Sequence, residues 1–239
     1  MFDHVTIRAS DPVASQRFYD TVLATVGLSR AAEEDFPVWC DYEFFVVGDR
    51  DVTRRLHIAF GAPSREHVDE FWRVGTAAGY PDDGAPGLRP QYGDDYYGSF
   101  LLDPDGNSAE AVFYDGMRRE GCIEHMWLRV ADVAASTRFY ETIAPHAGLF
   151  VRRVNEDRTQ LRGASGSFSV VSGTPTQHVH IAFPASDNAT VDEFHRVATA
   201  AGYVDNGAPG ERPYHPGYYG AFVLDPDGNN IEVVNHNRG

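Results

Sequence analysis

The sequence contains no lysine, because all 20 of its basic residues are arginine. This absence excludes mechanisms that need a lysine Schiff base, a lysine general base or the lysine of a phosphate-binding P-loop. The chain also lacks net positive charge, since 35 acidic residues against 20 basic ones give a formal charge of −15 at pH 7. A field of that sign repels nucleic acid and anionic membranes, so we expect neither as a partner.

Cysteine and long apolar runs are also scarce. Cys40 and Cys122 are the only cysteines, too few for a disulfide framework and not spaced as in a zinc finger, so we expect reduced thiols. No run approaches the length of about 18 apolar residues that a membrane helix needs, and the N-terminus lacks the pattern of a secretory signal. These features predict a cytoplasmic protein.

What is present is a repeat. The 239 residues, 42% hydrophobic and 13% aromatic, are enough for one large or two small folded domains. Three motifs occur twice in the same order: His-Ile-Ala-Phe at 57–60 and 180–183, Val-Asp-Glu-Phe at 68–71 and 191–194, and Asp-Pro-Asp-Gly-Asn at 103–107 and 225–229. We therefore predict two homologous domains, residues 1–117 and 121–239, joined by a seam near Asp115 to Gly121.

Each half contains a fainter repeat of its own. Four histidines are each followed 14 residues later by a phenylalanine: His4 and Phe18, His57 and Phe71, His125 and Phe139, His180 and Phe194. Each histidine lies in a strand-like run and each phenylalanine in a helix. Helix starts are predicted at Asp11, Asp132 and a capping box of Thr190 with Glu193. Four βαβββ units follow, which predict an α+β fold with curved mixed sheets around a cavity and helices outside.

Strand alternation places metal-binding residue types on one face of these strands. If the sheet of each half curls so that these faces converge, His4, His57 and Glu110 meet, as do His125, His180 and Glu232. Two imidazoles and one carboxylate bind a divalent ion and leave positions open for water or substrate, and Fe, Mn, Ni, Co and Zn all fit. The alternative is that these histidines are hydrogen-bonded core residues.

In their order and spacing, the strand histidines, the Phe-Tyr pair at 18–19, the His-Ile-Ala-Phe runs and the Asp-Pro-Asp-Gly-Asn-x-x-Glu hairpins resemble the vicinal oxygen chelate superfamily. That group includes glyoxalase I, bleomycin-resistance proteins and extradiol dioxygenases. The resemblance covers essentially the whole chain, once per half, and implies tandem glyoxalase-like domains. It implies the six residues above as metal ligands. Paired units in this family can exchange partners, which leaves open whether each site forms within a half or across the halves.

The resemblance implies a metal-dependent enzyme, a glyoxalase-like lyase or isomerase or a dioxygenase, acting on a small molecule with vicinal oxygens. The alternative is a binding protein without turnover, as in bleomycin resistance, whose acidic groove agrees with the charge of −15. A chain with one active and one degenerate half is also open. Two fused domains can satisfy their pairing in a monomer, and a homodimer is the other possibility.

The chain departs from specialised members of the family at two places. Glyoxalase I has a further carboxylate where this chain has Phe44–Val47 and Phe168–Val171, which leaves Glu43 as the nearest candidate. Extradiol dioxygenases carry a tyrosine ten residues before the ligand glutamate, where this chain has Phe100 and Phe222.

Five further residues are candidates for the cavity. We predict that His215, which has no counterpart in the first half, acts as general acid or base near neutral pH. Arg8 and Arg129 lie four residues beyond two of the ligand histidines, where they either hold an anionic substrate or pair with surplus carboxylates. Tyr96 and Tyr218 precede the hairpin strands and are placed to line the pocket with their hydroxyls.

Overall fold

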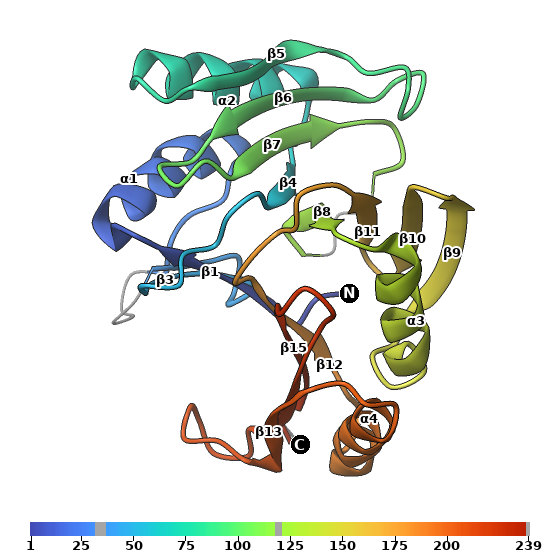
Figure 1. Ribbon diagram of the computed structural model, residues 1–239. Coiled ribbons are helices and arrows are strands. Elements are labelled where there is room, and N and C mark those ends of the chain that lie inside the picture. Colours follow the sequence, from blue (N-terminus) through green and yellow to red (C-terminus); the bar gives the residue numbers. More distant parts are fainter. Residues whose placement is uncertain (32–36, 118–120, 238–239) are drawn as a thin grey trace. The chain divides into compact units, whose positions relative to one another are not determined.

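The computed structural model describes residues 1–31, 37–117 and 121–237 (Figure 1). The chain forms two compact units, a first unit of Thr6–Trp127 and a second unit of Met1–Val5 with Leu128–Gly239. These units differ from the repeated segments 1–117 and 121–239, because each unit contains a short strand segment from the opposite half of the sequence. The predicted seam near Asp115 to Gly121 includes residues 118–120, which lie outside the described residues.

The first unit holds the first two repeats. Its elements are β1 (His4–Ala9, from Thr6 on), α1 (Pro12–Leu23), η1 (Ala24–Val26), β2 (Val38–Trp39), β3 (Phe44–Gly48), β4 (His57–Gly61), α2 (Arg65–Ala77), β5 (Asp82–Leu88), β6 (Tyr97–Leu102), β7 (Ser108–Phe113) and β8 (Ile123–Val130, up to Trp127). Five strands follow the order β5-β6-β7-β4-β8. The pair β4 and β7 is parallel, and the other neighbouring pairs of this order are antiparallel. Helix α2 packs on β6 and its neighbours (Figure 1).

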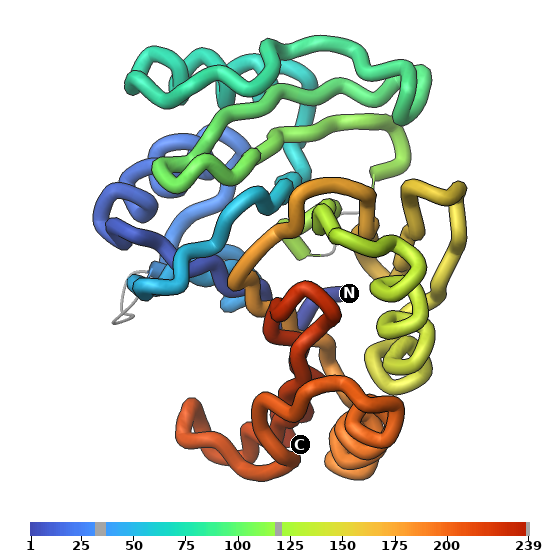
Figure 2. Tube along the Cα trace, in the orientation of Figure 1, coloured from blue at the N-terminus to red at the C-terminus, as the bar shows by residue number. Residues whose placement is uncertain are grey.

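The second unit repeats this plan. Its elements are the first two residues of β1, the end of β8, α3 (Val133–Ile143), β9 (Phe150–Asn155), β10 (Arg158–Arg162), β11 (Ser167–Ser172), β12 (His180–Pro184), α4 (Asn188–Ala200), β13 (Asp205–Glu211), β14 (Tyr219–Leu224) and β15 (Asn230–Asn235). The strand order β13-β14-β15-β12 continues into β1. Helix α4 packs on β14, and α3 packs on β11. Figure 2 follows β12 to β15 as the orange to red end of the tube.

Local signals set the helix starts much as expected. The side chain of Asp11 accepts hydrogen bonds from the backbone N–H groups of Val13 and Ala14, and Asp132 caps α3 in the same way. The predicted start of α4 at Thr190 is wrong, because the helix begins at Asn188 and its N-cap is Asp187. The carboxylate of Asp187 accepts from the Thr190 N–H, so Thr190 is the third residue of the helix.

The four repeated phenylalanines lie in the core. Phe18, Phe71, Phe139 and Phe194 have no exposed surface. Fully burying such a ring contributes about 2 to 3 kcal/mol relative to leaving it exposed. The helices and the two mixed sheets confirm the predicted α+β class. Among the described residues, no helix is long and apolar enough to cross a membrane.

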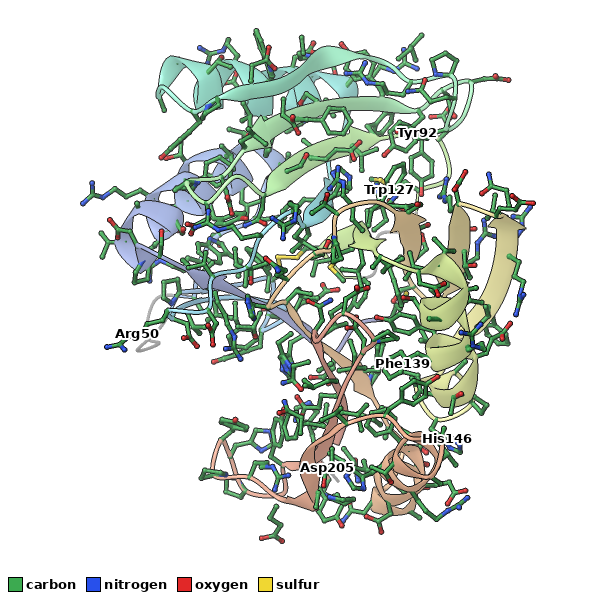
Figure 3. The ribbon with its side chains drawn as sticks, in the orientation of Figure 1. Arg50, Tyr92, Trp127, Phe139, His146 and Asp205 are labelled. Carbon is green, nitrogen blue, oxygen red and sulfur yellow. A yellow bond between two sulfur atoms is a disulfide. The ribbon has the colours of Figure 1, made fainter. Side chains whose placement is uncertain are left out.

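The prediction of two reduced thiols is wrong, because Cys40 and Cys122 form a disulfide within the first unit, drawn as a yellow bond in Figure 3. The two residues are 82 positions apart, so no local sequence pattern predicts that they pair. Cys40 lies in the turn between β2 and β3, and Cys122 directly precedes β8. Glu43, the nearest substitute for the further glyoxalase carboxylate, accepts a hydrogen bond from the Cys122 N–H at 2.6 Å. Glu43 therefore links the β2–β3 turn to the start of β8, as the disulfide does.

Candidate metal centres

In the first unit, three neighbouring strands bring two histidines and a glutamate together. Ala59 in the central strand β4 lies opposite Glu110 of β7 on one side and His125 of β8 on the other. His57 lies two residues before Ala59 and therefore on the same face of the sheet. Since cross-strand neighbours are about 5 Å apart and Ala59 is small, the three longer side chains converge above it.

The ligand atoms of this first site (His57, Glu110, His125) are close to one another. The His57 Nε2 atom lies 2.9 Å from the Glu110 Oε2 atom and 3.3 Å from the His125 Nε2 atom. The third side of the triangle, from His125 Nε2 to Glu110 Oε2, measures 3.5 Å. Glu110 is 1% exposed and both histidines are 8% exposed, so the first site lies inside the unit.

The second unit builds the same arrangement from different parts of the chain. Ala182 of β12 lies opposite Glu232 of β15, and the Asp3 N–H donates to the Ala182 carbonyl, which places His4 beside β12. In this second site (His4, His180, Glu232), the Nε2 atoms of His4 and His180 are 3.0 Å apart. The Glu232 Oε2 atom lies 3.0 Å from His180 Nε2 and 3.6 Å from His4 Nε2.

These distances fit the spacing of ligands on one ion. With ligand bonds of about 2.1 Å, neighbouring ligand atoms are about 3.0 Å apart in octahedral geometry and about 3.4 Å apart in tetrahedral geometry. Both sites hold one oxygen and two nitrogen atoms separated by 2.9 to 3.6 Å. The donor set therefore suits a divalent metal that keeps open positions.

Carboxylates fix the orientation of one histidine in each site. Asp3 Oδ1 lies 2.8 Å from His4 Nδ1, and Glu124 Oε2 bonds to His125 Nδ1 in the same way. Such a partner holds the proton on Nδ1 and leaves Nε2 bare for a metal. Burial acts to raise the pKa of Asp3, but its hydrogen bonds and charge interactions with His4 and His236 outweigh that and lower it. Asp3 therefore stays an acceptor.

Each ligand glutamate is oriented by a tyrosine and a glycine. The hydroxyl of Tyr96 donates to Glu110 Oε1 at 2.7 Å, and that of Tyr218 donates to Glu232 Oε1 at 2.8 Å. Burial, reinforced by the glutamate charge, raises the pKa of both phenols, so both keep the proton that they donate. A Cβ atom on Gly98 or Gly220 would lie only 2.5 Å from the same glutamate oxygen.

Aromatic rings lie beside the histidines of both sites. In the first unit, the His57 ring lies 5.7 Å from Trp127 and 5.9 Å from Phe100. Tyr92 meets Trp127 edge-on at 5.5 Å, and the two rings adjoin each other in Figure 3. In the second unit, Phe222 lies 6.1 Å from His180. These rings give each site an apolar neighbour against which a planar ligand can pack.

The structure corrects one grouping that the repeats suggested. His4 joins His180 and Glu232, and His125 joins His57 and Glu110, so each histidine of β1 and β8 belongs to the set from the opposite half. The physical reason is strand pairing, since the start of β1 extends the ladder that contains β12, and β8 pairs with β4.

The other candidates have different surroundings. Arg8 belongs to the first unit, whereas His4 belongs to the second, and it forms an ion pair with Asp49 at 2.9 Å. Arg129 belongs to the second unit, whereas His125 belongs to the first, and its backbone N–H donates to Thr176 Oγ1. No described contact joins either arginine to the candidate site of its own unit, and their role as substrate ligands stays a prediction.

His215 is joined by hydrogen bonds to His236 and onward to Asp3. The supporting residues Asp3, Glu124, Gly98, Gly220 and His236 were not predicted. One signal was present, because an acidic residue directly precedes both His4 and His125 in the aligned repeats.

Comparison with known proteins gives the fold a context. The profile of the Glyoxalase/Bleomycin resistance protein/Dioxygenase superfamily matches residues 122–233. Glyoxalase I from Zea mays superposes with a TM-score of 0.73 at 17% identity, covering 98% of this chain and 92% of that one. A putative dioxygenase from Bacillus subtilis superposes with a TM-score of 0.65 at 16% identity, covering 100% and 86%. No curated protein matches the sequence.

At these identities the structural likeness shows the fold alone, and the profile match is confined to residues 122–233. Both units show the same strand order around a His-His-Glu set whose glutamate is buried. Residues 122–233 therefore match the superfamily of glyoxalases, bleomycin-resistance proteins and dioxygenases, and the chain as a whole has the fold of the glyoxalase I structure.

Proposed function

We propose that the protein is a metal-dependent enzyme that acts on a small molecule with two adjacent oxygen atoms. The observation that carries this proposal is the pair of His-His-Glu sets, built at matching strand positions in each unit with donor atoms 2.9 to 3.6 Å apart. A divalent metal bound there would polarise the oxygens of a chelating substrate and stabilise negative charge that develops on them.

The protein's own contribution is to hold three donors in place, which would leave the other coordination positions of a metal for substrate. Asp3 and Glu124 keep one histidine of each site in the tautomer with a bare Nε2, while Tyr96 and Tyr218 hold the second oxygen of each glutamate. Because all three ligands come from adjacent strands, little reorganisation accompanies binding. The reaction class is a lyase or isomerase step or oxygenation, both of which use such an open set.

Elemental analysis of protein purified without chelator, then reconstituted with Fe, Mn, Ni, Co or Zn, tests the proposal. We expect two equivalents of metal per chain, and one equivalent after the double substitution of His180→Ala with Glu232→Ala. The matched control replaces His195 and Asp205, a pair of the same unit outside the candidate site whose atoms Nε2 and Oδ1 lie 2.9 Å apart, and it should keep two equivalents.

Metal-loaded protein is then screened with 2-oxoaldehydes and catechols. A chain that takes up no metal under any of these conditions overturns the proposal. In that case tight binding of a cationic or aromatic compound, unchanged by chelator, would identify the protein as a binding protein without turnover.

We further propose a cytoplasmic protein that works as a monomer of two fused domains or as a homodimer, with a small molecule as its partner. The Cys40–Cys122 disulfide argues against this location, because such bonds persist mainly in oxidising compartments. Mass spectrometry of the alkylated protein from intact cells tests the point. Fully alkylated thiols agree with the cytoplasm, and a retained disulfide contradicts it.

A further inference from the structure

Two hydrogen bonds connect an exposed carboxylate of the first unit to its candidate metal site. Ser108 is the first residue of β7 and lies opposite His57 of β4 in the parallel strand pair. Its Oγ atom lies 3.2 Å from His57 Nδ1 and donates to Asp83 Oδ2 at 2.6 Å. Asp83 is an exposed residue near the start of β5, whereas His57 is buried. The three side chains therefore form one connected line from the surface to the site.

The direction of these bonds suits a histidine that binds a metal through Nε2. A serine hydroxyl has one proton, and Ser108 donates that proton to Asp83. The Ser108 oxygen therefore meets His57 Nδ1 with a lone pair and accepts a hydrogen bond from it. A histidine that coordinates through Nε2 carries its remaining proton on Nδ1, where it needs an acceptor. Ser108 is thus the partner that the metal-bound form of His57 requires.

The second unit has a line of side chains in the same place. The aligned repeats put Asn206 at the position of Asp83 and Asn230 at the position of Ser108. The side-chain amide of Asn206 donates to Asn230 Oδ1 at 3.0 Å, and Asn230 Nδ2 lies 2.8 Å from His180 Nδ1. Both units therefore support the histidine of their central strand through the first residue of β7 or β15. An amide can donate or accept, whereas a carboxylate can only accept.

We propose that Asp83 is a positioning residue of the first metal site and that it acts through Ser108 to keep a proton on His57 Nδ1 and the Nε2 atom facing the metal. The inference rests on the proposed function, because it concerns a metal site named there. Carboxylates behind metal-binding histidines orient the ring and strengthen it as a donor. Glu124 contacts His125 directly, whereas Asp83 reaches His57 through one hydroxyl group.

The direction of the line is tested on metal-free protein by long-range 1H–15N NMR of the His57 ring. We expect Nδ1 to be protonated in the parent protein. Ser108→Ala and Asp83→Asn should each shift the proton toward Nε2, which lies 2.9 Å from Glu110 Oε2. Ser108→Thr keeps the hydroxyl and should keep the parent spectrum. An unprotonated Nδ1 in the parent protein, or an unchanged spectrum in Ser108→Ala, overturns the proposal.

The effect on the metal is measured as the Co2+ affinity of the first site, in protein whose second site is disabled by His180→Ala and Glu232→Ala. Ser108→Ala and Asp83→Asn should each weaken Co2+ binding about tenfold, and Ser108→Thr should restore it. Asp82→Asn is the matched control, because it removes the same charge from the neighbouring position of β5. We expect its affinity to stay close to that of the parent protein.

A double variant separates positioning from a general effect of charge. If Asp83 acts through Ser108, Asp83→Asn should cause no further loss in the Ser108→Ala protein, so the two losses do not add. A carboxylate that attracts the metal by its charge alone would weaken binding equally with and without Ser108, and that additive result overturns the proposal. If the first site takes up no Co2+, the proposed function fails there, and the NMR spectra then show by themselves whether Asp83 and Ser108 hold the His57 ring.

Discussion

Substitution of Gly220 by alanine should remove the metal from the second site without harming the fold. Gly220 lies in β14, and an added Cβ would come within 2.5 Å of Glu232 Oε1. To restore an ordinary contact of about 3.5 Å, the carboxylate must move by roughly 1 Å. Its hydrogen bond from Tyr218 at 2.8 Å and its position 3.0 Å from His180 cannot both survive that shift.

The expected magnitude follows from the tolerance of metal sites. Ligand distances hold to within about 0.2 Å, so a displacement of roughly 1 Å takes Glu232 out of the ligand set. We expect the second site to lose at least 100-fold in affinity, which corresponds to about 2.7 kcal/mol or more. The backbone should tolerate the change, because Gly220 does not have a positive φ. Alanine within an element is otherwise favoured over glycine by about 0.5 to 1 kcal/mol.

Metal titration and thermal unfolding are measured on the same preparation. Gly220→Ala should bind one equivalent of metal in place of two and unfold without metal at or above the parent temperature. The unaltered first site is an internal reference, and Gly98→Ala should show the mirror result. Two equivalents with unchanged affinity in Gly220→Ala would refute the reasoning.

Three further predictions concern other contacts. Tyr218→Phe removes one hydrogen bond to Glu232 and should weaken metal binding at the second site about tenfold in a titration, while an unchanged affinity would contradict the role of the hydroxyl. Cys40→Ser opens a loop that spans 82 residues and should lower the free energy of unfolding by about 4 kcal/mol in a denaturant titration, a loss that dithiothreitol should reproduce in the parent protein alone. Burial, only partly offset by hydrogen bonds from Asn229 and Asp227, raises the pKa of Asp225 to about 6 from 3.8. Since its ionisation is disfavoured in the folded state, its stabilising contribution is complete below about pH 4 and is lost as the pH rises through about 6, by about 3 kcal/mol. Asp225→Asn should flatten that part of the pH profile of unfolding, and an unchanged slope would contradict the assignment.

The local parts of the fold could be read from the chain because their signals are local. Asp11 and Asp132 cap helices through bonds to residues two or three positions ahead, and that contact needs no distant partner. The one misplaced helix start, Thr190 in place of Asp187, shows the limit of such signals, because Thr190 and Asp187 both have capping side chains in one short segment.

The candidate site was predicted in its residue types and only partly in its assembly. Alternation along a strand showed which side chains share a face, so all six ligand candidates were named, including His57 and Glu110. Their supporting groups escaped notice for different reasons. Gly98 has no side chain to suggest a role. The contacts of His236 include His215, which lies 21 residues away in the chain, so its sequence neighbours do not reveal them.

The sequence by itself determined the repeat, the α+β class and the residue types of the two candidate ligand sets. Only the tertiary structure decided that His4 joins His180 and Glu232, and that Cys40 meets Cys122. The physical reason is that strand pairing and disulfide formation join residues far apart in the chain, as Asp3 N–H with the Ala182 carbonyl and Cys40 with Cys122 across 82 positions. The alternation of residues along a strand specifies which side chains share a face. Which other strand pairs beside it, and so which side chains complete the site, depends on the packing of the whole unit.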